Sequence, residues 1–451
     1  MPVSDRTVLL IRSEFESCIL THFKDLGLDS ALLKALDQRG YQTPTPIQTA
    51  AIPELLKGSD LLGIAQTGTG KTAAFALPIL DRLSKLKGRP DRGTCRALIL
   101  SPTRELAAQI GESFRTYGKF LRVSQATVFG GVSISSQIRA VGQGVDIVVA
   151  TPGRLVDLID RRVLSLAKVE VLVLDEVDQM LDLGFIHAIR KITGLLPAKR
   201  QNLFFSATMP KEIAGLAAAL LRDPVCVEIT PRATTVERVN QSIIHVETRN
   251  KLALLLNLLE QNAMPRTLVF TRTKHGADKV VKGLIQKRIE TAAIHGNKSQ
   301  SQRERALASF KSSRLRVLVA TDIAARGIDI DGVSHVVNYD LPFVPDSYVH
   351  RIGRTARAGA SGEAVAFCDH EERPLLRDIE RTIRQKIPVT QHAMSIATPD
   401  PGERSGAAQG HHRPHQNQPS WRKKPGQKPQ GGARGKWRPK QQQRQGGGQP
   451  R

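Results

Sequence analysis

The sequence predicts an α/β protein built from two similar halves. Hydrophobic residues make up 40% of the chain and aromatic residues only 4%, which suits an aliphatic α/β interior better than an aromatic-rich β-sandwich. Short apolar runs alternate with amphipathic segments, and this alternation occurs twice. Runs that are apolar throughout are typical of strands buried on both faces, which form parallel sheets joined by helices. A length of 451 residues suits two such domains with additional segments.

The predicted helices and strands follow this alternation from the N-terminus onward. No pattern is recognisable before about residue 20, and the first amphipathic helix covers Ser30 to Gln38 and ends before Gly40. The strands predicted for the first half are Asp60–Ala65, Ala97–Leu100, Ile147–Ala150, Val169–Leu174 and Leu203–Phe205. The strands predicted for the second half are Thr267–Phe270, Thr291–Ile294, Val317–Ala320, His335–Asn338 and Ala364–Cys368.

The composition of the connecting segments places the domain boundaries. The stretch from Glu228 to Asn240 is polar and contains Pro231, which favours a hinge. After about Pro399 hardly any aliphatic residue remains to form a core, so this Gly/Gln/Arg/Lys-rich tail is predicted to be disordered. We therefore expect an N-terminal extension at 1–20, a first domain at 21–228, a linker at 229–240, a second domain at 241–392 and the tail at 393–451.

The chain carries a large positive charge. It contains 66 Lys and Arg against 42 Asp and Glu, a formal net charge of +24. Such a field attracts polyanions, so nucleic acid is the leading candidate partner. Charge alone also allows a cationic, soluble surface without a specific partner.

The C-terminal tail shares this charge. Within 401–451 twelve basic residues accompany the single acid Glu403, and both tryptophans, Trp421 and Trp437, lie there. Attraction to phosphates and stacking of indoles on unpaired bases predict an RNA tether. A purely solubilising tail is the alternative.

Cysteine spacing and hydropathy favour a cytoplasmic protein. Cys18, Cys95, Cys226 and Cys368 lie far apart, without the paired spacing of a zinc site or a redox couple. We therefore predict free thiols in a reducing compartment. The apolar run at 8–11 is too short for a signal peptide, and no segment approaches the length of a membrane span, so no membrane partner is expected.

A glycine-rich loop follows the first predicted strand and opens a helix. Its residues are Ala65, Gln66, Thr67, Gly68, Thr69, Gly70, Lys71 and Thr72, an order typical of a phosphate-binding loop in which Ala65 replaces the usual first glycine. Gly68 and Gly70 let backbone N–H groups approach phosphates. Lys71 is predicted to bridge the β- and γ-phosphates, and the Thr72 hydroxyl to bind Mg²⁺. A glycine-rich turn with a capping threonine is the alternative.

Acidic residues follow the strand at 169–174. Acids at the carboxyl end of a buried parallel strand face the ligand crevice. Asp175 is predicted to reach Mg²⁺, partly through water, and Glu176 to orient and deprotonate the attacking water. An acidic turn that caps the next helix is the alternative, and it suits Asp178 better than the other two.

Two more motifs make the resemblance to one protein family specific. The stretch from Gly40 to Gln48 reads GYQTPTPIQ, and the stretch from His350 to Arg357 reads HRIGRTAR. With the phosphate loop and the acids, they resemble the DEAD-box ATP-dependent RNA helicases, most nearly the bacterial RhlE-like type with a basic C-terminal tail. The resemblance covers about Phe23 to Val389. It implies two tandem RecA-like domains that close over ATP and RNA together.

The resemblance assigns residues to the nucleotide. Gln48 carries a carboxamide that can donate to and accept from the adenine edge at once, which implies ATP as the cofactor. Phe23 matches the aromatic residue that stacks on adenine, whereas a phenylalanine on its own is more often a core residue. Arg354 corresponds to an arginine finger, with Arg351 beside it on the γ-phosphate. The other residues implied to contact ATP are Tyr41, Gly327 and Asp329.

Loops at the ends of strands supply the implied RNA contacts. They offer hydroxyls, glycine amides or an arginine to phosphate oxygens without selecting a base. In the first half these residues are Pro102, Thr103, Arg104, Gly130, Gly131, Thr151, Pro152, Gly153 and Arg154. In the second half they are Thr271, Gly296, Gln300, Arg303, Thr321 and Asp322. Taken singly, each could be an ordinary loop with a capping threonine.

A coupling role is implied for residues between the two ligands. They are Asp178, Ser206, Ala207, Thr208 and His350, of which the Ser-Ala-Thr sequence is implied to hydrogen-bond the acids at 175–178. The chain departs from the family pattern at Val177, where Ala is usual, and at Ala356, where Gly is frequent. A larger side chain at Val177 is expected to alter the packing beside the acids.

These observations predict an RNA-stimulated ATPase that uses Mg²⁺ and separates short RNA duplexes or remodels RNA–protein complexes. The alternative from another class is an ATP-gated RNA clamp or annealing chaperone. A DNA translocase is a third possibility, for which the sequence offers no feature of processive tracking. Ribosome-assembly or RNA-decay proteins are the candidate protein partners.

Overall fold

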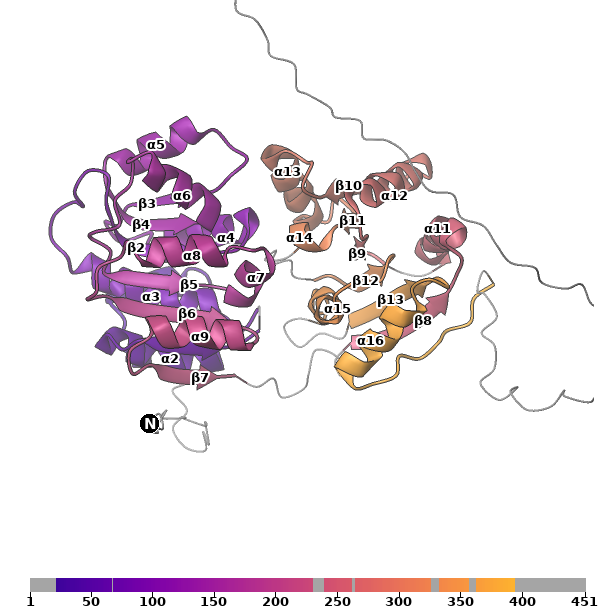
Figure 1. Ribbon diagram of the computed structural model, residues 1–451, viewed down its shortest axis with the longest axis horizontal. Coiled ribbons are helices and arrows are strands. Elements are labelled where there is room, and N and C mark those ends of the chain that lie inside the picture. The colour runs from indigo at the N-terminus through magenta and orange to yellow at the C-terminus, as the bar shows by residue number, and fades with distance from the viewer. Residues whose placement is uncertain are drawn as a thin grey trace, which may run out of the picture. The chain divides into compact units, whose positions relative to one another are not determined.

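The computed structural model describes residues 22–66, 68–229, 239–261, 264–325, 332–356 and 362–393, apart from the side chains of residues 323 and 325. The predicted site residues Thr67, Gly327 and Asp329 and the predicted tail lie outside these ranges. Within them the chain forms two parallel sheets flanked by helices, which confirms the predicted α/β class (Figure 1).

The first half folds around a parallel sheet that has seven strands within the described residues, in the order β3-β4-β2-β5-β6-β1-β7. Its strands are β1 (Leu61–Ile64), β2 (Cys95–Leu100), β3 (Gln125–Val128), β4 (Val145–Ala150), β5 (Val171–Leu174), β6 (Gln201–Ser206) and β7 (Val225–Glu228). Its helices are η1 (Phe23–Leu26), α1 (Ser30–Asp37), α2 (Pro46–Lys57), α3 (Lys71–Ser84), α4 (Arg104–Tyr117), α5 (Ile134–Gly142), α6 (Pro152–Asp160), α7 (Val177–Asp182), α8 (Ile186–Thr193) and α9 (Lys211–Leu220).

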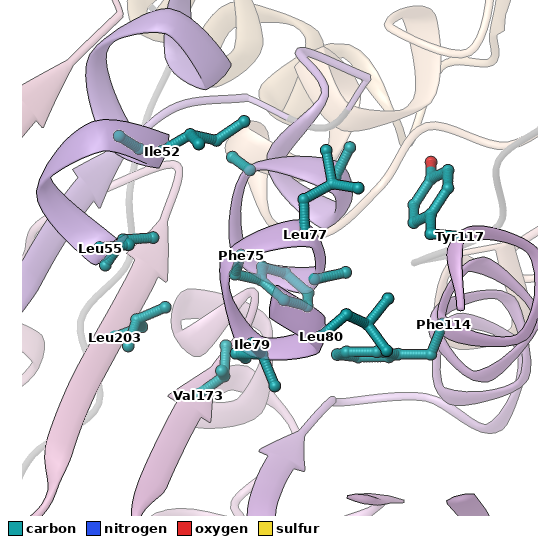
Figure 2. Packing of buried hydrophobic residues seen from close by; sticks show 14 of the residues in the cluster. Ile52, Leu55, Phe75, Leu77, Ile79, Leu80, Phe114, Tyr117, Val173 and Leu203 are labelled. Atoms are coloured by element: carbon teal, nitrogen blue, oxygen red, sulfur yellow. The ribbon is translucent and has the colours of Figure 1, made fainter. Parts of the chain in front are cut away.

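Strand residues of this sheet alternate between two apolar cores. Ile99 and Val173 belong to the core formed with α2, α3 and α4, whereas Leu98 belongs to the core formed with α6 to α9. Figure 2 shows the first of these cores, in which the ring of Phe75 lies 6.2 Å from that of Phe114. Burial on both faces explains why these strands are apolar throughout.

The second half repeats this arrangement with a six-stranded parallel sheet among the described residues, in the order β10-β11-β9-β12-β13-β8. Its strands are β8 (Val239–His245), β9 (Thr267–Phe270), β10 (Thr291–Ile294), β11 (Val317–Ala320), β12 (His335–Asn338) and β13 (Gly362–Cys368). Its helices are η2 (Thr248–Asn250), α11 (Lys251–Gln261), α12 (Lys274–Gln286), α13 (Gln300–Lys311), α14 (Asp322–Ala325), α15 (Pro345–Ile352) and α16 (Arg373–Ile383).

Both faces of the second sheet are buried too. Val269 and Val319 pack with α11 and α12, whereas Leu268 and Leu318 pack with α13, α15 and α16. None of the described helices combines the length and hydropathy that a membrane-spanning segment needs.

Local sequence explains where several helices begin and end. Pro46 stands in the first turn of α2, where a missing N–H costs nothing, and Gly58 ends the helix at a φ of 91°. The Thr103 hydroxyl caps α4 by accepting a hydrogen bond from the N–H of Leu106 at 3.3 Å. These caps fix the loops that precede α2 and α4.

Three strands were absent from the sequence prediction. β3 and β7 lie at the two edges of the first sheet, and β8 lies at an edge of the second. β8 begins at Val239, inside the range 229–240 that we assigned to the linker. Edge strands contact fewer neighbours, so their sequences need not be apolar throughout and their periodic signal is weaker.

Candidate nucleotide site and nucleic-acid interface

The glycine-rich loop lies between β1 and α3, at the carboxyl edge of the first sheet. Gly68 and Gly70 have φ angles of 87° and 95°, a left-handed backbone that favours glycine. A Cβ atom on Gly70 would lie 2.5 Å from Nε2 of Gln48 and 2.7 Å from Oγ1 of Thr45. Gly70 is therefore required both by its backbone angle and by the close approach of α2.

Gln48 connects α2 to this loop. Its Oε1 accepts a hydrogen bond from the N–H of Thr45 at 2.9 Å, and its Nε2 donates to the carbonyl of Gly70 at 3.1 Å. A carboxamide has a second N–H and a second lone pair. The buried Gln48 side chain thus holds the phosphate loop with one half of its hydrogen-bonding capacity and keeps the other half for the predicted adenine contact.

Lys71 is the first residue of α3 and its side chain is buried. Its Nζ donates to the backbone carbonyl of Ala65 at 2.9 Å, across the loop. Thr69 closes the same turn by donating from its hydroxyl to the carbonyl of Gln66 at 2.8 Å. An ammonium has three donors, so Lys71 keeps two for phosphate oxygens. Thr72, the predicted Mg²⁺ ligand, follows it on the helix and is half-buried.

Asp175 and Glu176 lie at the end of β5, the strand that separates β2 from β6. Burial raises the pKa of Asp175 to about 7, although Lys71 acts to lower it. Its Oδ1 is buried and has no hydrogen-bond partner among the described residues. A buried carboxylate of this kind is stabilised by a cation, which fits the predicted Mg²⁺. Within the described ranges, no group of three or more His, Cys, Asp or Glu side chains is placed to hold a metal ion by itself.

Glu176 has a left-handed backbone with a φ of 54° at the start of α7. This conformation is costly for a residue with a Cβ, and such strain is concentrated at functional sites. The turn places Glu176 directly after Asp175 and before the helix that begins at Val177. Backbone strain at this position supports a chemical role for Glu176.

The Ser-Ala-Thr sequence at the end of β6 contacts Asp178, one of the acids that the resemblance implies. Oδ2 of Asp178 accepts a hydrogen bond from the N–H of Ala207 at 3.1 Å and lies 3.5 Å from the Thr208 hydroxyl. The Ser206 hydroxyl donates to the carbonyl of Thr208 at 2.7 Å, which shapes this turn. The N–H of Ala65 donates to the carbonyl of Ser206 at 3.0 Å, so the turn also adjoins the phosphate loop.

The two predicted aromatic contacts differ in exposure. Phe23 is buried in the core of the first half, which agrees with the alternative that it is a core residue. Tyr41 is 48% exposed, and its ring lies 6.4 Å from that of Tyr117. Of the two, Tyr41 presents the accessible ring in this structure.

The predicted RNA-contacting loops of the first half converge. Seven of their residues line one hollow at the carboxyl edge of the sheet: Pro102, Thr103, Arg104, Gly130, Thr151, Gly153 and Arg154. A Cβ atom on Gly131 would lie 1.9 Å from Nη1 of Arg104, so glycine there lets the guanidinium lie against the loop. Nη1 of Arg154 donates to the carbonyl of Val132 at 3.3 Å.

The corresponding residues of the second half are partly buried. The Thr271 hydroxyl follows β9 and donates to the carbonyl of Thr273 at 3.2 Å. Gln300 begins α13, the helix that also carries Arg303, and Gly296 is exposed after β10. Thr321 and Asp322 follow β11 and are half-buried.

Arg351 and Arg354, both predicted to face the γ-phosphate, lie at the end of α15. Arg351 is 1% exposed, and its guanidinium donates to both carboxylate oxygens of Asp322 at 2.5 and 2.8 Å. It also donates to Oδ1 of Asn338 at 3.0 Å and to the carbonyl of Asp340 at 2.6 Å. These contacts commit Arg351 to its own half of the molecule. Nε of Arg354 donates to the carbonyl of His350 at 3.2 Å.

Four charged residues near these motifs were absent from the sequence prediction. Lys251, Arg272, Asp340 and Glu372 form one polar network behind the loops that follow β9 and β12. Asp340 and Arg272 each lie just beyond the carboxyl end of a buried strand, a signal that could have identified them. Lys251 and Glu372 carry no such signal, because each stands at the start of a helix far away in sequence.

The first half thus brings a phosphate loop and an Asp-Glu pair together at the carboxyl edge of a parallel sheet, which defines a P-loop ATPase. The second half repeats the sheet order without a phosphate loop and adds an arginine-rich motif, as in helicases.

Comparisons with known proteins identify the family. Residues 45–216 match the DEAD/DEAH box helicase family, and residues 250–359 match the helicase conserved C-terminal domain. The chain is 42% identical over 368 residues to the DEAD-box ATP-dependent RNA helicase CshA of Bacillus cereus, covering 82% of this chain and 69% of that protein. It is 44% identical over 365 residues to the ATP-dependent RNA helicase CshA of Limosilactobacillus reuteri, covering 81% and 72%. The chain belongs to the DEAD-box ATP-dependent RNA helicases.

Solved structures share its fold. S. cerevisiae Dbp5 bound to RNA and ADP BeF3 is similar with a TM-score of 0.73 and 30% identity, covering 82% of this chain and 95% of that chain. Mss116p bound to ssRNA and AMP-PNP is similar with a TM-score of 0.73 and 27% identity, covering 84% and 81%. The two sheets are therefore RecA-like. The RhlE-like subtype stays a prediction, because the relatives above carry the name CshA.

Proposed function

We propose that this RNA helicase hydrolyses ATP at the carboxyl edge of its first sheet, with Lys71, Asp175 and Glu176 as the reacting groups of that half. The observation that carries this assignment is the buried Asp175 carboxylate, whose pKa is raised to about 7 by burial and which adjoins Lys71 and Glu176. Groups with strongly perturbed pKa values are concentrated in catalytic sites.

Thr72 and Asp175 are the residues that would hold Mg²⁺, partly through water. A bound magnesium ion supplies charge neutralisation to the β- and γ-phosphates. The chain's own groups do the remaining work. Lys71 binds phosphate oxygens with its two uncommitted N–H donors, and the N–H groups of Gly68 and Gly70 line the cradle.

Glu176 would orient the attacking water and accept its proton. Its left-handed backbone, at a φ of 54°, fixes the carboxylate at the strand end before any ligand binds. Asp178, two residues further, connects this turn to Ala207 by a 3.1 Å hydrogen bond. A change at the Ser-Ala-Thr turn therefore reaches the hydrolytic residues through one short contact.

RNA would contact the loops that line the hollow of the first half, through backbone amides and through Arg104 and Arg154. Such contacts grip the phosphate backbone without reading bases. Arg354 of the second half, with Gly327 and Asp329, would complete the nucleotide site when both ligands favour the closed arrangement of the two domains. The same proposal includes the predicted domain limits and a cytoplasmic location. It also includes the tail as an RNA tether and partners in ribosome assembly or RNA decay.

The test is Glu176→Gln, which keeps the size of the side chain and removes its basicity. We expect RNA-stimulated ATP turnover to fall by about 10²- to 10⁴-fold, because a general base contributes that much. Binding of a non-hydrolysable ATP analogue and of RNA should stay within about twofold of the wild type. Both are measured on the full chain, turnover by phosphate release and binding by fluorescence anisotropy of a labelled RNA.

A matched control is Glu112→Gln, an exposed carboxylate of the same half. The variant and the control are also compared in release of a short RNA duplex. If Glu176→Gln turned over ATP like its control, Glu176 would not be the base. If it lost turnover but released and rebound duplexes repeatedly at the wild-type rate, the ATP-gated clamp would describe the protein better.

A further inference from the structure

The two sheets have the same topology, so positions in one half have counterparts in the other. Numbered within each half, the strand order is third, fourth, second, fifth, sixth, first. Val389 even forms a parallel bridge with Ile243 of β8, on the side where β7 adjoins β1. β8 therefore corresponds to β1, β12 to β5 and β13 to β6.

Lys251 is the counterpart of the phosphate-loop lysine. Lys71 is the first residue of the helix that follows β1, and Lys251 is the first residue of α11, which follows β8. Asp340 follows β12 as Asp175 and Glu176 follow β5. The N–H of Tyr339 donates to the carbonyl of Phe270 as that of Asp175 donates to Leu100, so Asp340 corresponds to Glu176.

A protein carboxylate occupies the position of a bound anion in the second half. Nζ of Lys251 lies 2.6 Å from Oε2 of Glu372, and the N–H of Asp369 donates to the same oxygen at 3.3 Å. Oε1 of Glu372 accepts from Arg272 and from the N–H of Leu341, the latter at 3.0 Å. Two cations and two backbone N–H groups surrounding one buried anion resemble the donor set that a phosphate cradle offers.

Neighbouring carboxylates keep the buried ammonium of Lys251 charged. Burial acts against the charged form of Lys251, but Glu372, Asp340 and Asp369 together keep its pKa above the ordinary value. Lys251 is 1% exposed and Glu372 is 3% exposed. Lys251 therefore stays charged at neutral pH although it is desolvated, and both side chains are buried in contact with each other, so their geometry is tightly specified.

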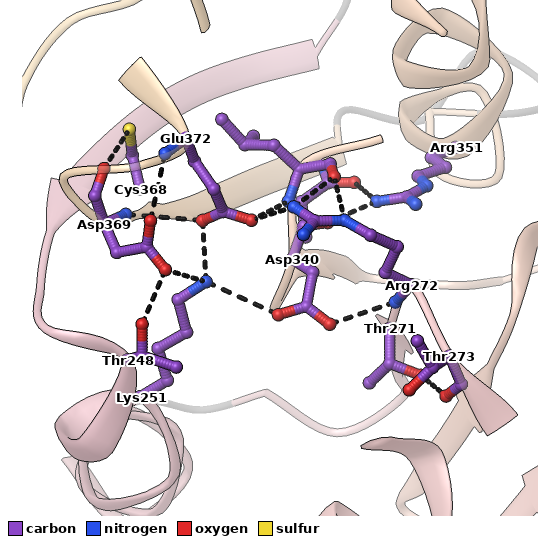
Figure 3. A network of polar contacts seen from close by, with 12 residues as sticks. Thr248, Lys251, Thr271, Arg272, Thr273, Asp340, Arg351, Cys368, Asp369 and Glu372 are labelled. Carbon is purple, nitrogen blue, oxygen red and sulfur yellow. Dashed lines mark hydrogen bonds and ion pairs between the residues drawn. The ribbon is translucent and has the colours of Figure 1, made fainter. Parts of the chain in front are cut away.

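Glu372 reaches the RNA and nucleotide motifs through the loop after β12 (Figure 3). Arg272, directly after Thr271, donates its N–H to Oδ2 of Asp340 at 3.0 Å and its Nη2 to the carbonyl of Leu341 at 3.1 Å. The carbonyl of Asp340 accepts from Arg351 at 2.6 Å. Arg351 in turn holds Asp322.

We propose that Glu372 is a positioning residue, an internal anion that fills the second half's counterpart of the nucleotide site and thereby fixes Arg272, Asp340 and Arg351 for RNA-stimulated ATP hydrolysis. Glu372 touches neither ligand in this assignment. In this proposal, Arg351 acts by binding Asp322 and the carbonyl of Asp340 in the loop after β12. These contacts fix the start of the motif that also carries Arg354. The functional part rests on the proposed site, in which Arg354 meets the nucleotide.

The test is Glu372→Ala in the full chain, with chemical rescue by formate. Removal of the carboxylate leaves Lys251, Arg272 and the two N–H groups around a cavity that a small carboxylate can enter. We expect the kcat of RNA-stimulated ATP hydrolysis to fall by about 10- to 100-fold, because misplaced groups reduce rate by such factors. The KM for ATP should change by less than about threefold, because the first half holds the nucleotide.

Sodium formate at concentrations of tens of millimolar should restore a substantial part of the lost kcat, whereas equal sodium chloride should not. Glu372→Gln is assayed in parallel, because it keeps the size and shape of the glutamate side chain. It serves as the test variant if Glu372→Ala folds poorly. The matched control is Glu380→Ala, on the same helix. That carboxylate accepts from Lys386 at 2.5 Å and from the N–H of Ile387 at 3.2 Å, away from the motif loops.

Each outcome decides the proposal. Loss of kcat in the Glu372 variants with formate rescue, and little change in Glu380→Ala, supports positioning. Equal effects in both helix positions, or a lowered melting temperature with unchanged kcat in the folded protein, means that Glu372 only stabilises the fold and overturns the proposal. Absence of RNA stimulation in the wild type would instead overturn the proposed function.

Discussion

The two halves of the molecule share one sheet order and differ in what fills the carboxyl edge of the sheet. In the first half, the edge carries a glycine-rich loop, and Asp175 has a buried oxygen without a hydrogen-bond partner within the described part of the chain. In the second half, the corresponding lysine, Lys251, pairs with Glu372 and also with the corresponding acid, Asp340. The comparison teaches that a nucleotide site and a rigid scaffold can be built from the same donors.

The difference follows from the loop after the first strand. In the first half Gly68 and Gly70 have left-handed φ angles, which allow backbone amides to turn inward. In the second half the loop is the short helix η2 and leads straight to Lys251. This loop contains no glycine, and the buried ammonium of Lys251 is neutralised by protein carboxylates, because burying a lone charge is costly.

Removal of the two corresponding lysines gives the largest expected effects. Lys71→Met should lower ATP turnover by about 10²- to 10³-fold, because it removes a preorganised donor to the phosphates. Lys251→Met should lower the free energy of unfolding by about 3–5 kcal/mol, because it removes the buried cation that pairs with Glu372, Asp340 and Asp369. Phosphate release and scanning calorimetry on both variants measure the two quantities.

The two variants serve as controls for each other. Lys71→Met should retain the wild-type melting temperature, and Lys251→Met should retain affinity for a fluorescent ATP analogue. A large loss of nucleotide affinity in Lys251→Met would mean that the second half's edge still binds nucleotide. That result would contradict the view that only the first half's edge is a nucleotide site.

Sequence reasoning predicted the interior of each sheet better than its margins. The four strands Thr267–Phe270, Thr291–Ile294, Val317–Ala320 and His335–Asn338 have the predicted bounds. Three of them, β9, β11 and β12, lie inside the sheet and are buried on both faces, whereas β10 is an edge strand whose short run is still mostly apolar. β3 and β8 were missed because Gln125, Asn240 and Gln241 interrupt their apolar patterns at the edges.

The site shows the same division. The phosphate loop, the acids and the Ser-Ala-Thr turn are contiguous motifs, and the structure brings them together through neighbouring strands. The network around Glu372 escaped prediction because its partners Lys251 and Arg272 lie about a hundred residues away. Only the parallel topology places them side by side, and no local pattern encodes it.

Val177→Ala tests the packing behind the acids of the first half. Val177 is 1% exposed in an apolar core that includes Leu174 and Phe204. Loss of two buried methyl groups should lower the free energy of unfolding by about 2 kcal/mol. Turnover should change by less than about twofold, because alanine is the usual residue of the family motif and Asp178 keeps its bond to Ala207.

Chemical unfolding and phosphate release measure the two effects, with Val132→Ala as the control because Val132 is 37% exposed. The free energy of unfolding of the control should change by less than about 0.5 kcal/mol. A several-fold change in RNA-stimulated kcat in Val177→Ala would show that the valine tunes coupling as well as packing.

Ala356→Gly compares backbone strain at single residues of the two halves. Each half holds a residue with a side chain at a φ of 54° beside a motif, Glu176 in the first and Ala356 in the second. The strain at Glu176 accompanies a proposed catalytic carboxylate, whereas a methyl group offers no such function. Glycine at 356 should therefore raise the free energy of unfolding by about 0.5–1 kcal/mol, because relief of left-handed strain exceeds the added entropy of the unfolded chain.

The matched control is Ala308→Gly, an exposed position within α13. There the same substitution should lower the free energy of unfolding by about 1 kcal/mol, since glycine is unfavourable inside a helix. Calorimetry on both variants thus looks for shifts of opposite sign. If Ala356→Gly destabilised the protein as Ala308→Gly does, the left-handed turn would not be strained, and strain at Glu176 would lose its value as a mark of function.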